Sequence, residues 1–159
     1  MTYYTYTDTP AGELLLVGDS TLLRAAYWTS YRHAPTPGPD WTADASQFEA
    51  PLLQLAEYFA GKRTTFDLPH QATGSAFQQR VWEELSRIAY GQTRSYKQIA
   101  EAIGKPQAVR AVGAAIGRNP LSIIVPCHRV IASNGHLTGF AGGLESKHAL
   151  LTHEGALQA

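Results

Sequence analysis

A single cysteine, Cys127, is the feature that most restricts how this chain of 159 residues can fold. One thiol forms no internal disulfide and cannot complete a thiolate-rich zinc site, and the six histidines lack the close spacing of a structural zinc site. The fold must therefore rest on an apolar core, which a chain of this length can bury as one domain or as one domain with a small appendage. We expect no bound metal and no cofactor.

The sequence around the cysteine indicates chemistry more than packing. Cys127 lies in the heptapeptide Ile-Val-Pro-Cys-His-Arg-Val, so that an imidazole and a guanidinium follow it directly. A thiol is a strong nucleophile only as the thiolate, and neighbouring cations lower its pKa from about 8.5. A lone cysteine is more commonly a small buried hydrophobe. Here the context favours a nucleophile, placed after a strand-like entry in a buried turn or helix start.

Charge is divided unevenly along the chain, although the net charge is zero. Residues 1–70 carry four Lys or Arg against eight Asp or Glu, whereas residues 71–159 carry nine against five. Only the second part could present a basic surface to phosphates, although ordinary solvated charge explains such a difference equally well. The N-terminus shows no signal-peptide pattern and no stretch approaches 18 apolar residues, so we expect a cytoplasmic protein without a membrane span.

The first part of the chain is typical of a mixed sheet and helix. Three β-rich segments open it, at residues 2–7, 13–17 and 22–28, with a hairpin turn at 18–20. A Pro- and Gly-rich stretch over residues 29–45 predicts a loop or linker, and Ser46 can cap a helix that runs to about Ala60. Residues 64–70 look extended. We expect an N-terminal α/β subdomain over residues 1–70.

The second part is mostly helical, and we expect it to form a C-terminal domain over residues 71–159. Ser75 can cap a helix over 76–88, and Ser95 can begin a short helix over 96–103. A further helix runs from about Lys105 to Ile116, and the pair forms a helix-turn-helix pattern, which also occurs in small helical domains that bind no DNA. The fold class predicted is therefore α+β, with the helix-turn-helix and the active-site cysteine in the second domain.

The second helix of this pair has unusually small side chains. Glycine inside a helix costs about 1 kcal/mol relative to alanine, so Gly113 suggests that another surface approaches closely. Arg110 is the only charged residue inside this helix, and Ala108 and Ala111 flank it. A DNA groove or a packed neighbouring helix would explain this pattern, and so would an ordinary solvated arginine.

Two features near the C-terminus need separate explanations. The glycine-rich block over residues 135–143 predicts a hairpin or loop of close backbone approach and matches neither a dinucleotide nor a phosphate-loop fingerprint. Glu154 follows a predicted helix over 145–153, where a carboxylate is unfavourable because helix C-termini prefer cations. We therefore expect Glu154 to interact with something other than its own helix.

Several short motifs follow one another in the second part of the chain: Asn119-Pro120, Pro126-Cys127-His128-Arg129-Val130, Gly142-Gly143-Leu144, Lys147 and Leu150-Leu151-Thr152-His153-Glu154-Gly155. Taken together, these motifs resemble the O6-alkylguanine-DNA alkyltransferases, also called methylated-DNA–protein-cysteine methyltransferases. The resemblance runs from about Ala76 to Gly155 with matching spacing, whereas the N-terminal part is similar only in architecture.

The resemblance implies a catalytic set in which Cys127 is the nucleophile, His128 the base and Glu154 the group that orients it. A water is expected to bridge Cys127 and His128, because neighbouring side chains can point apart. The thiolate would displace guanine from the alkyl carbon on O6, with Tyr96 assisting protonation of the leaving base. Asn119 would shape the turn before the active site. Without the resemblance, Tyr96 is an aromatic residue at a helix start and Asn119 an ordinary loop residue.

The resemblance also implies that the partner is double-stranded DNA containing O6-alkylguanine, with O4-alkylthymine as a further candidate, and that a monomer repairs one lesion. The second helix would enter the minor groove, and Arg110 would fill the space left by the flipped base. Residues expected to contact DNA are Tyr96, Ala108, Arg110, Ala111, Arg118 and Arg129. Residues expected to line the substrate pocket are Val130, Phe140, Ala141 and Gly142, with Phe140 replacing the family's usual tyrosine.

Three other functions stay open at this point. Non-catalytic alkyltransferase-like proteins recognise damaged bases but carry tryptophan where this chain has Cys127. A thiol hydrolase could use a Cys-His-Glu arrangement and would turn over many times. A helix-turn-helix regulator would need no cysteine. Certain relatives hold a structural zinc in the N-terminal domain, which we do not expect here because the chain has no second cysteine.

Overall fold

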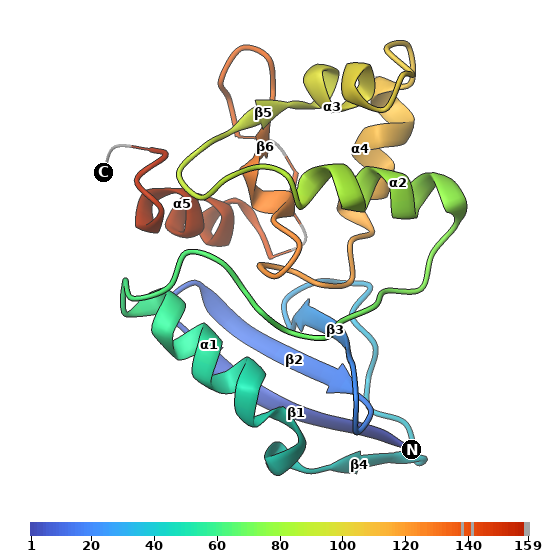
Figure 1. Ribbon diagram of the computed structural model, residues 1–159, viewed down its shortest axis with the longest axis vertical. Helices are drawn as coiled ribbons and strands as arrows, with labels where there is room; N and C mark the ends of the chain where they lie inside the picture. The colour runs from blue at the N-terminus through green and yellow to red at the C-terminus, as the bar shows by residue number, and fades with distance from the viewer. Residues whose placement is uncertain (138, 141, 158–159) are drawn as a thin grey trace.

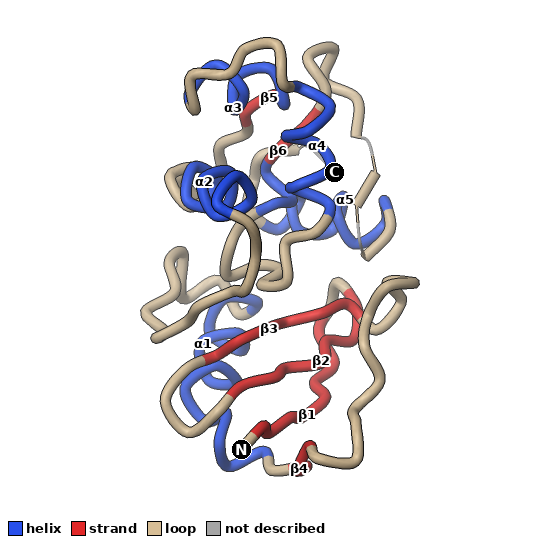
Figure 2. Tube along the Cα trace, turned by 90° about the vertical axis from the view of Figure 1, so that its right-hand side faces the viewer, coloured by secondary structure: helices blue, strands red, loops and turns tan. Residues whose placement is uncertain are grey.

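The computed structural model describes residues 1–137, 139–140 and 142–157, and places an N-terminal sheet domain beneath a mainly helical domain (Figure 1). Figure 2 shows the same division, with strands β1 to β4 gathered at one end of the molecule and most helices at the other. The predicted α+β class is confirmed. No helix within the described residues is long and apolar enough to cross a membrane.

The sheet has four strands in the order β3-β2-β1-β4. They are β1 (Thr2–Thr9), β2 (Gly12–Gly18), β3 (Leu23–Trp28) and β4 (Trp41–Ala43). The first three form antiparallel pairs, and β4 adds to β1 in parallel. Strand β4 falls inside the stretch predicted as a loop. The sequence did not predict this strand, because its three residues become a strand only by pairing with the edge of β1;.

One face of the sheet is covered by the 3-10 helix η1 (Ala45–Phe48) and by α1 (Glu49–Phe59) (Figure 1). The helical cap is Asp44 and not the predicted Ser46, because the Asp44 carboxylate accepts a hydrogen bond from the Ser46 amide. Tyr58, near the end of α1, is completely buried. The extended segment predicted over 64–70 is limited to one bridge, between Leu23 and His70.

The second domain is built from short elements. They are α2 (Ala76–Leu85), β5 (Arg94–Ser95), α3 (Tyr96–Ala102), α4 (Val109–Gly117), η2 (Cys127–Arg129), β6 (Val130–Ile131) and α5 (Leu144–His153). Ser75 and Ser95 both form the predicted caps, each within a capping box;. Helix α2 ends three residues earlier than predicted, and α4 begins at Val109 because residues 105–108 form a turn.

The edge of β3 joins the sheet to the loop that leads to Cys127. The Ala26 amide donates to the Pro120 carbonyl at 2.7 Å, and the Ser122 amide donates to the Ala26 carbonyl at 3.1 Å. On the other side of the cysteine, the Ser146 hydroxyl at the start of α5 donates to the Ala11 carbonyl at 2.5 Å. The first domain therefore supports the backbone on both sides of the candidate site.

Candidate active site

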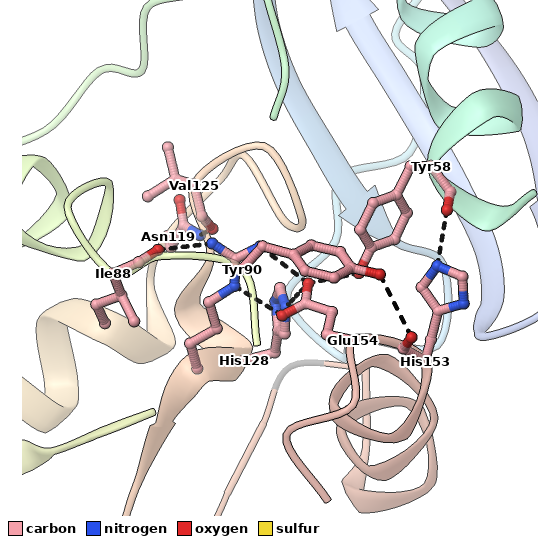
Figure 3. Close-up of polar contacts among 9 residues, drawn as sticks. Tyr58, Ile88, Tyr90, Asn119, Val125, His128, His153 and Glu154 are labelled. Atoms are coloured by element: carbon pink, nitrogen blue, oxygen red, sulfur yellow. Dashed lines mark hydrogen bonds and ion pairs between the residues drawn. The ribbon is translucent and has the colours of Figure 1, made fainter. Parts of the chain in front are cut away.

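Cys127 begins the 3-10 helix η2 and is almost completely buried, as predicted from Pro126 and the apolar entry. Asn119 shapes the preceding loop, because its amide group donates to the Val125 carbonyl at 2.9 Å and its side-chain oxygen accepts from the Leu121 amide at 3.0 Å (Figure 3). The asparagine thus closes the turn between α4 and the nucleophile.

The same loop contains a strained residue. Ile123 has a φ of 72° although it is β-branched and completely enclosed. Such a backbone conformation costs of the order of 1–3 kcal/mol and persists only where its surroundings enforce it. The hydrogen bonds of Asn119 and the bridge between Ser122 and Val125 supply that constraint four residues before the thiol.

His128 and Glu154 form a buried pair behind the cysteine. His128 Nε2 lies 2.8 Å from Glu154 Oε2, and neither side chain is exposed (Figure 3). With Nε2 donating to the carboxylate, the lone pair of the ring is on Nδ1, which has no hydrogen-bond partner among the described protein groups;. Within the residues that the structure describes, no direct hydrogen bond joins the His128 ring to the Cys127 thiol. The arrangement provides a base oriented by a carboxylate.

Arg129 occupies a different place from the one expected. Its Nε and Nη2 donate to the two oxygens of Glu154 at 2.8 and 2.9 Å, and its Nη1 donates to the Ile88 carbonyl at 2.7 Å. Arg129 is 7% exposed, and its guanidinium donates its hydrogen bonds inside the protein. The expectation that Arg129 contacts DNA therefore does not hold, because a buried carboxylate requires this counter-charge.

The hydrogen bonds keep Glu154 ionised. Burial would raise the pKa of Glu154, but hydrogen bonds from His128, Arg129 and Tyr58 outweigh it and hold the pKa well below its usual range. Burial lowers the pKa of His128, and the Glu154 carboxylate opposes that shift. Glu154 is the first residue beyond α5, where its charge is unfavourable for the helix, and the structure confirms that it interacts elsewhere.

The environment of the thiol differs from the one that sequence adjacency predicts. Burial raises the pKa of Cys127, while a hydrogen bond from Asn119 and the charge of Lys147 lower it to a smaller extent. The two basic residues that follow Cys127 in sequence bind Glu154, His128 through Nε2 and Arg129 through its guanidinium. The resting site therefore holds a neutral thiol and a neutral imidazole, and the thiolate forms when a proton is transferred.

Lys147 was part of the motif pattern, but the sequence did not predict that it lies buried near the thiol. It is 1% exposed in α5, and its Nζ donates to the Val130 carbonyl at 2.6 Å and lies 5.9 Å from the centre of the Tyr96 ring. Burial lowers the pKa of Lys147 to about 8, against the opposing influence of Cys127. A signal was present, since Lys147 shares the helical spacing i, i+3, i+4 with the buried Leu150 and Leu151.

Helix α4 presents one face to the outside and one to the core. Val112, Ala115 and Ile116 are buried, and the Trp82 indole donates to the Ala115 carbonyl at 2.8 Å. A methyl group on Gly113 would make only ordinary contact with the Tyr96 ring, so close packing within the protein does not require this glycine. The exposed face consists of Arg110, Ala111, Ala114, Gly117 and Arg118, and Ala108 is half-buried at the helix start.

A pocket of about 570 Å³ lies between the two domains. Phe140 and Gly142 line it, while Val130 is fully buried and Ala141 lies outside the described residues. A methyl group on Gly142 would come within 2.8 Å of Trp28, so only glycine fits there, and Phe140 packs edge-on against the same indole at 6.1 Å. The remaining described residues that line the pocket are Ser30, Tyr31, Arg32, His33, Ala114, Gly117, Arg118, Gly139 and Gly143.

This combination defines a class of protein in which a buried cysteine nucleophile, backed by a His–Glu pair, shares a domain with a helix-turn-helix. Comparison with known proteins identifies the family within this class. The model of the 6-O-methylguanine DNA methyltransferase DNA-binding domain matches residues 76–156, and that of the ribonuclease-like domain of the same enzymes matches residues 2–72.

Curated relatives and solved structures agree with the family models. The methylated-DNA–protein-cysteine methyltransferase of Mycobacterium tuberculosis is 47% identical over 97% of this chain and 93% of its own, and the constitutive enzyme of Bacillus subtilis is 45% identical over 95% and 93%. The crystal structure of Mycobacterium tuberculosis OGT in complex with DNA superposes with a TM-score of 0.90, at 46% identity, covering 96% of this chain and 92% of that one. The chain belongs to the 6-O-methylguanine DNA methyltransferase family.

Proposed function

We propose that this protein repairs DNA by transferring an alkyl group from O6 of guanine to Cys127, once per molecule. The observation that carries the proposal is the buried Cys127 with the His128–Glu154 pair behind it, in the same domain as the helix-turn-helix. The names of the relatives at 45–47% identity support the same reaction. O4-alkylthymine is a second candidate substrate of the same site.

The proton route follows from the hydrogen bonds. The thiol proton passes through a bridging water to Nδ1 of His128, while the Glu154 carboxylate stabilises the imidazolium through Nε2;. Lys147 supplies a positive charge beside the thiolate. Sulfur then attacks the alkyl carbon, the S–C bond forms as the C–O bond breaks, and guanine receives a proton with the help of Tyr96. The thioether is stable, so the protein is consumed.

The DNA-binding surface that we propose is the exposed face of α4. Arg110 is exposed next to the small side chains of Ala111 and Ala114, so a groove wall could approach the backbone and Arg110 could replace a flipped base;. Ala108, Ala111, Arg118 and Tyr96 would complete the contact.

We further propose two domains over residues 1–70 and 71–159, a monomeric protein and a cytoplasmic location. The two family models, which match residues 2–72 and 76–156, support the division.

Mass spectrometry after incubation with excess O6-methylguanine duplex tests the reaction. We expect every molecule to gain one methyl group, about 14 Da, on Cys127, and no further lesions to be repaired. The Cys127→Ser variant should bind the duplex without gaining mass. Many lesions repaired per molecule would indicate a hydrolase instead, and binding without transfer in the unaltered protein would indicate a damage sensor.

A further inference from the structure

A side chain of the N-terminal domain reaches the carboxylate behind the nucleophile. The Tyr58 hydroxyl, at the end of α1, donates to Glu154 Oε2 at 2.6 Å, and both groups are buried (Figure 3). That oxygen also receives hydrogen bonds from His128 and from Arg129. Residues 58 and 154 are 96 positions apart in sequence, so only the docking of the two domains brings them together.

The position of Tyr58 is itself defined by the helix that precedes Glu154. Nε2 of His153 lies 2.7 Å from the Tyr58 carbonyl, and the two rings pack with their centres 4.9 Å apart. The Phe66 ring also packs against the tyrosine, with the ring centres 5.5 Å apart. The ring therefore has little freedom, and its hydroxyl points at one carboxylate oxygen.

We propose that Tyr58 is a positioning residue for alkyl transfer, through which the N-terminal domain sets the orientation and basicity of Glu154. The proposal rests on the relay proposed above, in which Glu154 acts on His128. A donated hydrogen bond fixes the carboxylate rotamer and withdraws electron density from Oε2, which moderates its attraction for the His128 proton. Tyr58 keeps its own proton, since burial raises the pKa of its hydroxyl and the neighbouring carboxylate raises it further.

A purely structural role would give a different result. The Tyr58 ring fills space between α1 and α5, and phenylalanine would fill nearly the same space without the hydroxyl. Tyr90 offers a matched control, because its ring lies 6.1 Å from that of Tyr58 but its hydroxyl donates to the His153 carbonyl at 3.4 Å and not to Glu154. Tyr90→Phe therefore removes a half-buried hydroxyl nearby and leaves the hydrogen bonds of the carboxylate unchanged.

The test compares single-turnover alkyl transfer across pH for Tyr58→Phe, Tyr90→Phe, Glu154→Gln and the double variant Tyr58→Phe/Glu154→Gln. We expect Tyr58→Phe to slow transfer roughly tenfold near neutral pH, the scale of a lost hydrogen bond to a charged group, because more of His128 is then already protonated and cannot accept the thiol proton. Its acid limb should move to higher pH, because a more basic carboxylate holds the His128 proton more firmly. Tyr90→Phe should retain the rate and the profile, and the double variant should be no slower than Glu154→Gln alone.

Each contrary outcome has a defined meaning. An unshifted profile in folded Tyr58→Phe, or multiplied losses in the double variant, would overturn the role of Tyr58 while leaving the relay intact. A normal profile in Glu154→Gln would remove the relay itself. If Tyr58→Phe does not fold, fluorotyrosine at position 58 keeps the ring and makes the hydroxyl a stronger donor. The acid limb should then move to lower pH, and an unchanged limb would overturn the proposal.

Discussion

The two functional regions of this protein are built in opposite ways. Behind Cys127, four polar side chains meet out of contact with water, and each depends on the others for its charge and orientation. On α4, in contrast, the face that we propose for DNA binding consists of exposed small side chains and two exposed arginines. Substitutions in the first region should therefore affect folding and chemistry together, and those in the second should affect DNA alone.

The largest effect should come from the ion pair in the interior. Arg129→Ala leaves the Glu154 carboxylate buried without its bidentate partner, and we expect a loss of about 3–5 kcal/mol in the free energy of unfolding. Urea denaturation measures it. Arg87→Ala is the control, because the exposed Arg87 pairs with the exposed Glu83 and with Glu84, which keeps Arg94 as a second partner, so we expect a loss of about 0–1 kcal/mol;. Equal losses in the free energy of unfolding for the two variants would contradict the greater contribution expected of the buried ion pair.

Glu154→Gln should next separate chemistry from DNA binding. Without the negative charge, the His128 imidazolium is less stable and thiolate formation is harder, so we expect transfer at pH 7 to fall about tenfold or more. The rate should partly recover as pH rises, because hydroxide then removes the proton. Melting temperature should fall as well, since Arg129 loses its counter-charge.

DNA affinity of Glu154→Gln should be unchanged, because the residue lies outside the helix-turn-helix. Single-turnover rates measured across pH test whether Glu154 takes part in the relay. A pH–rate curve that keeps its shape in the folded variant would exclude Glu154 from the relay.

Arg110→Ala tests the exposed region. We expect repair of an O6-methylguanine duplex to slow roughly tenfold, because the variant no longer stabilises an extruded base, which costs a few kcal/mol to flip. Reaction with free O6-benzylguanine should be unaffected, since no base is flipped. Arg80→Ala removes one exposed positive charge from α2 and controls for the general electrostatic attraction between the protein and DNA. Equal losses on both substrates would place Arg110 in the active site or in general stability.

The smallest effect should be seen at Lys147, which is near the thiol but does not form part of the His–Glu pair. Its pKa of about 8 means that its charge, and the support that it gives the thiolate, is lost above about pH 8. The wild-type rate should therefore decline at alkaline pH, and the Lys147→Met rate should lack this decline. At pH 7 we expect Lys147→Met to react severalfold more slowly than the wild type, because the thiolate loses up to about 1.4 kcal/mol of stabilisation, which corresponds to about one unit in the pKa of Cys127.

The contribution of Lys147 to stability should change with pH in the opposite direction to its contribution to the rate. The unfolded chain binds the Lys147 proton up to its ordinary pKa near 10.4, so the wild-type free energy of unfolding gains from this group as pH rises above about 8;. Lys147→Met should lack that gain. Parallel pH profiles in the two proteins would show that Lys147 does not titrate in this range.

Local sequence patterns were sufficient for many elements. Ser75 and Ser95 cap their helices because the capping box depends on residues within three positions of one another;. The buried turn at Cys127 follows from Pro126 and the apolar run before it. The placement of Glu154 at an unfavourable helix end correctly indicated a partner elsewhere, although the pattern did not identify Arg129 or Tyr58 as part of that contact.

The sequence by itself determined the fold class and the helix-turn-helix pattern and singled out Cys127 as the candidate nucleophile, since these depend on residue type and short spacing. Only the tertiary structure decided which cation faces the sulfur and which faces the carboxylate. His128 Nε2 and the Arg129 guanidinium bind Glu154, and packing of α5 brings the charge of Lys147 near Cys127. Tyr58 reaches Glu154 only after domain docking, because burying a carboxylate requires donors from wherever the fold can supply them;.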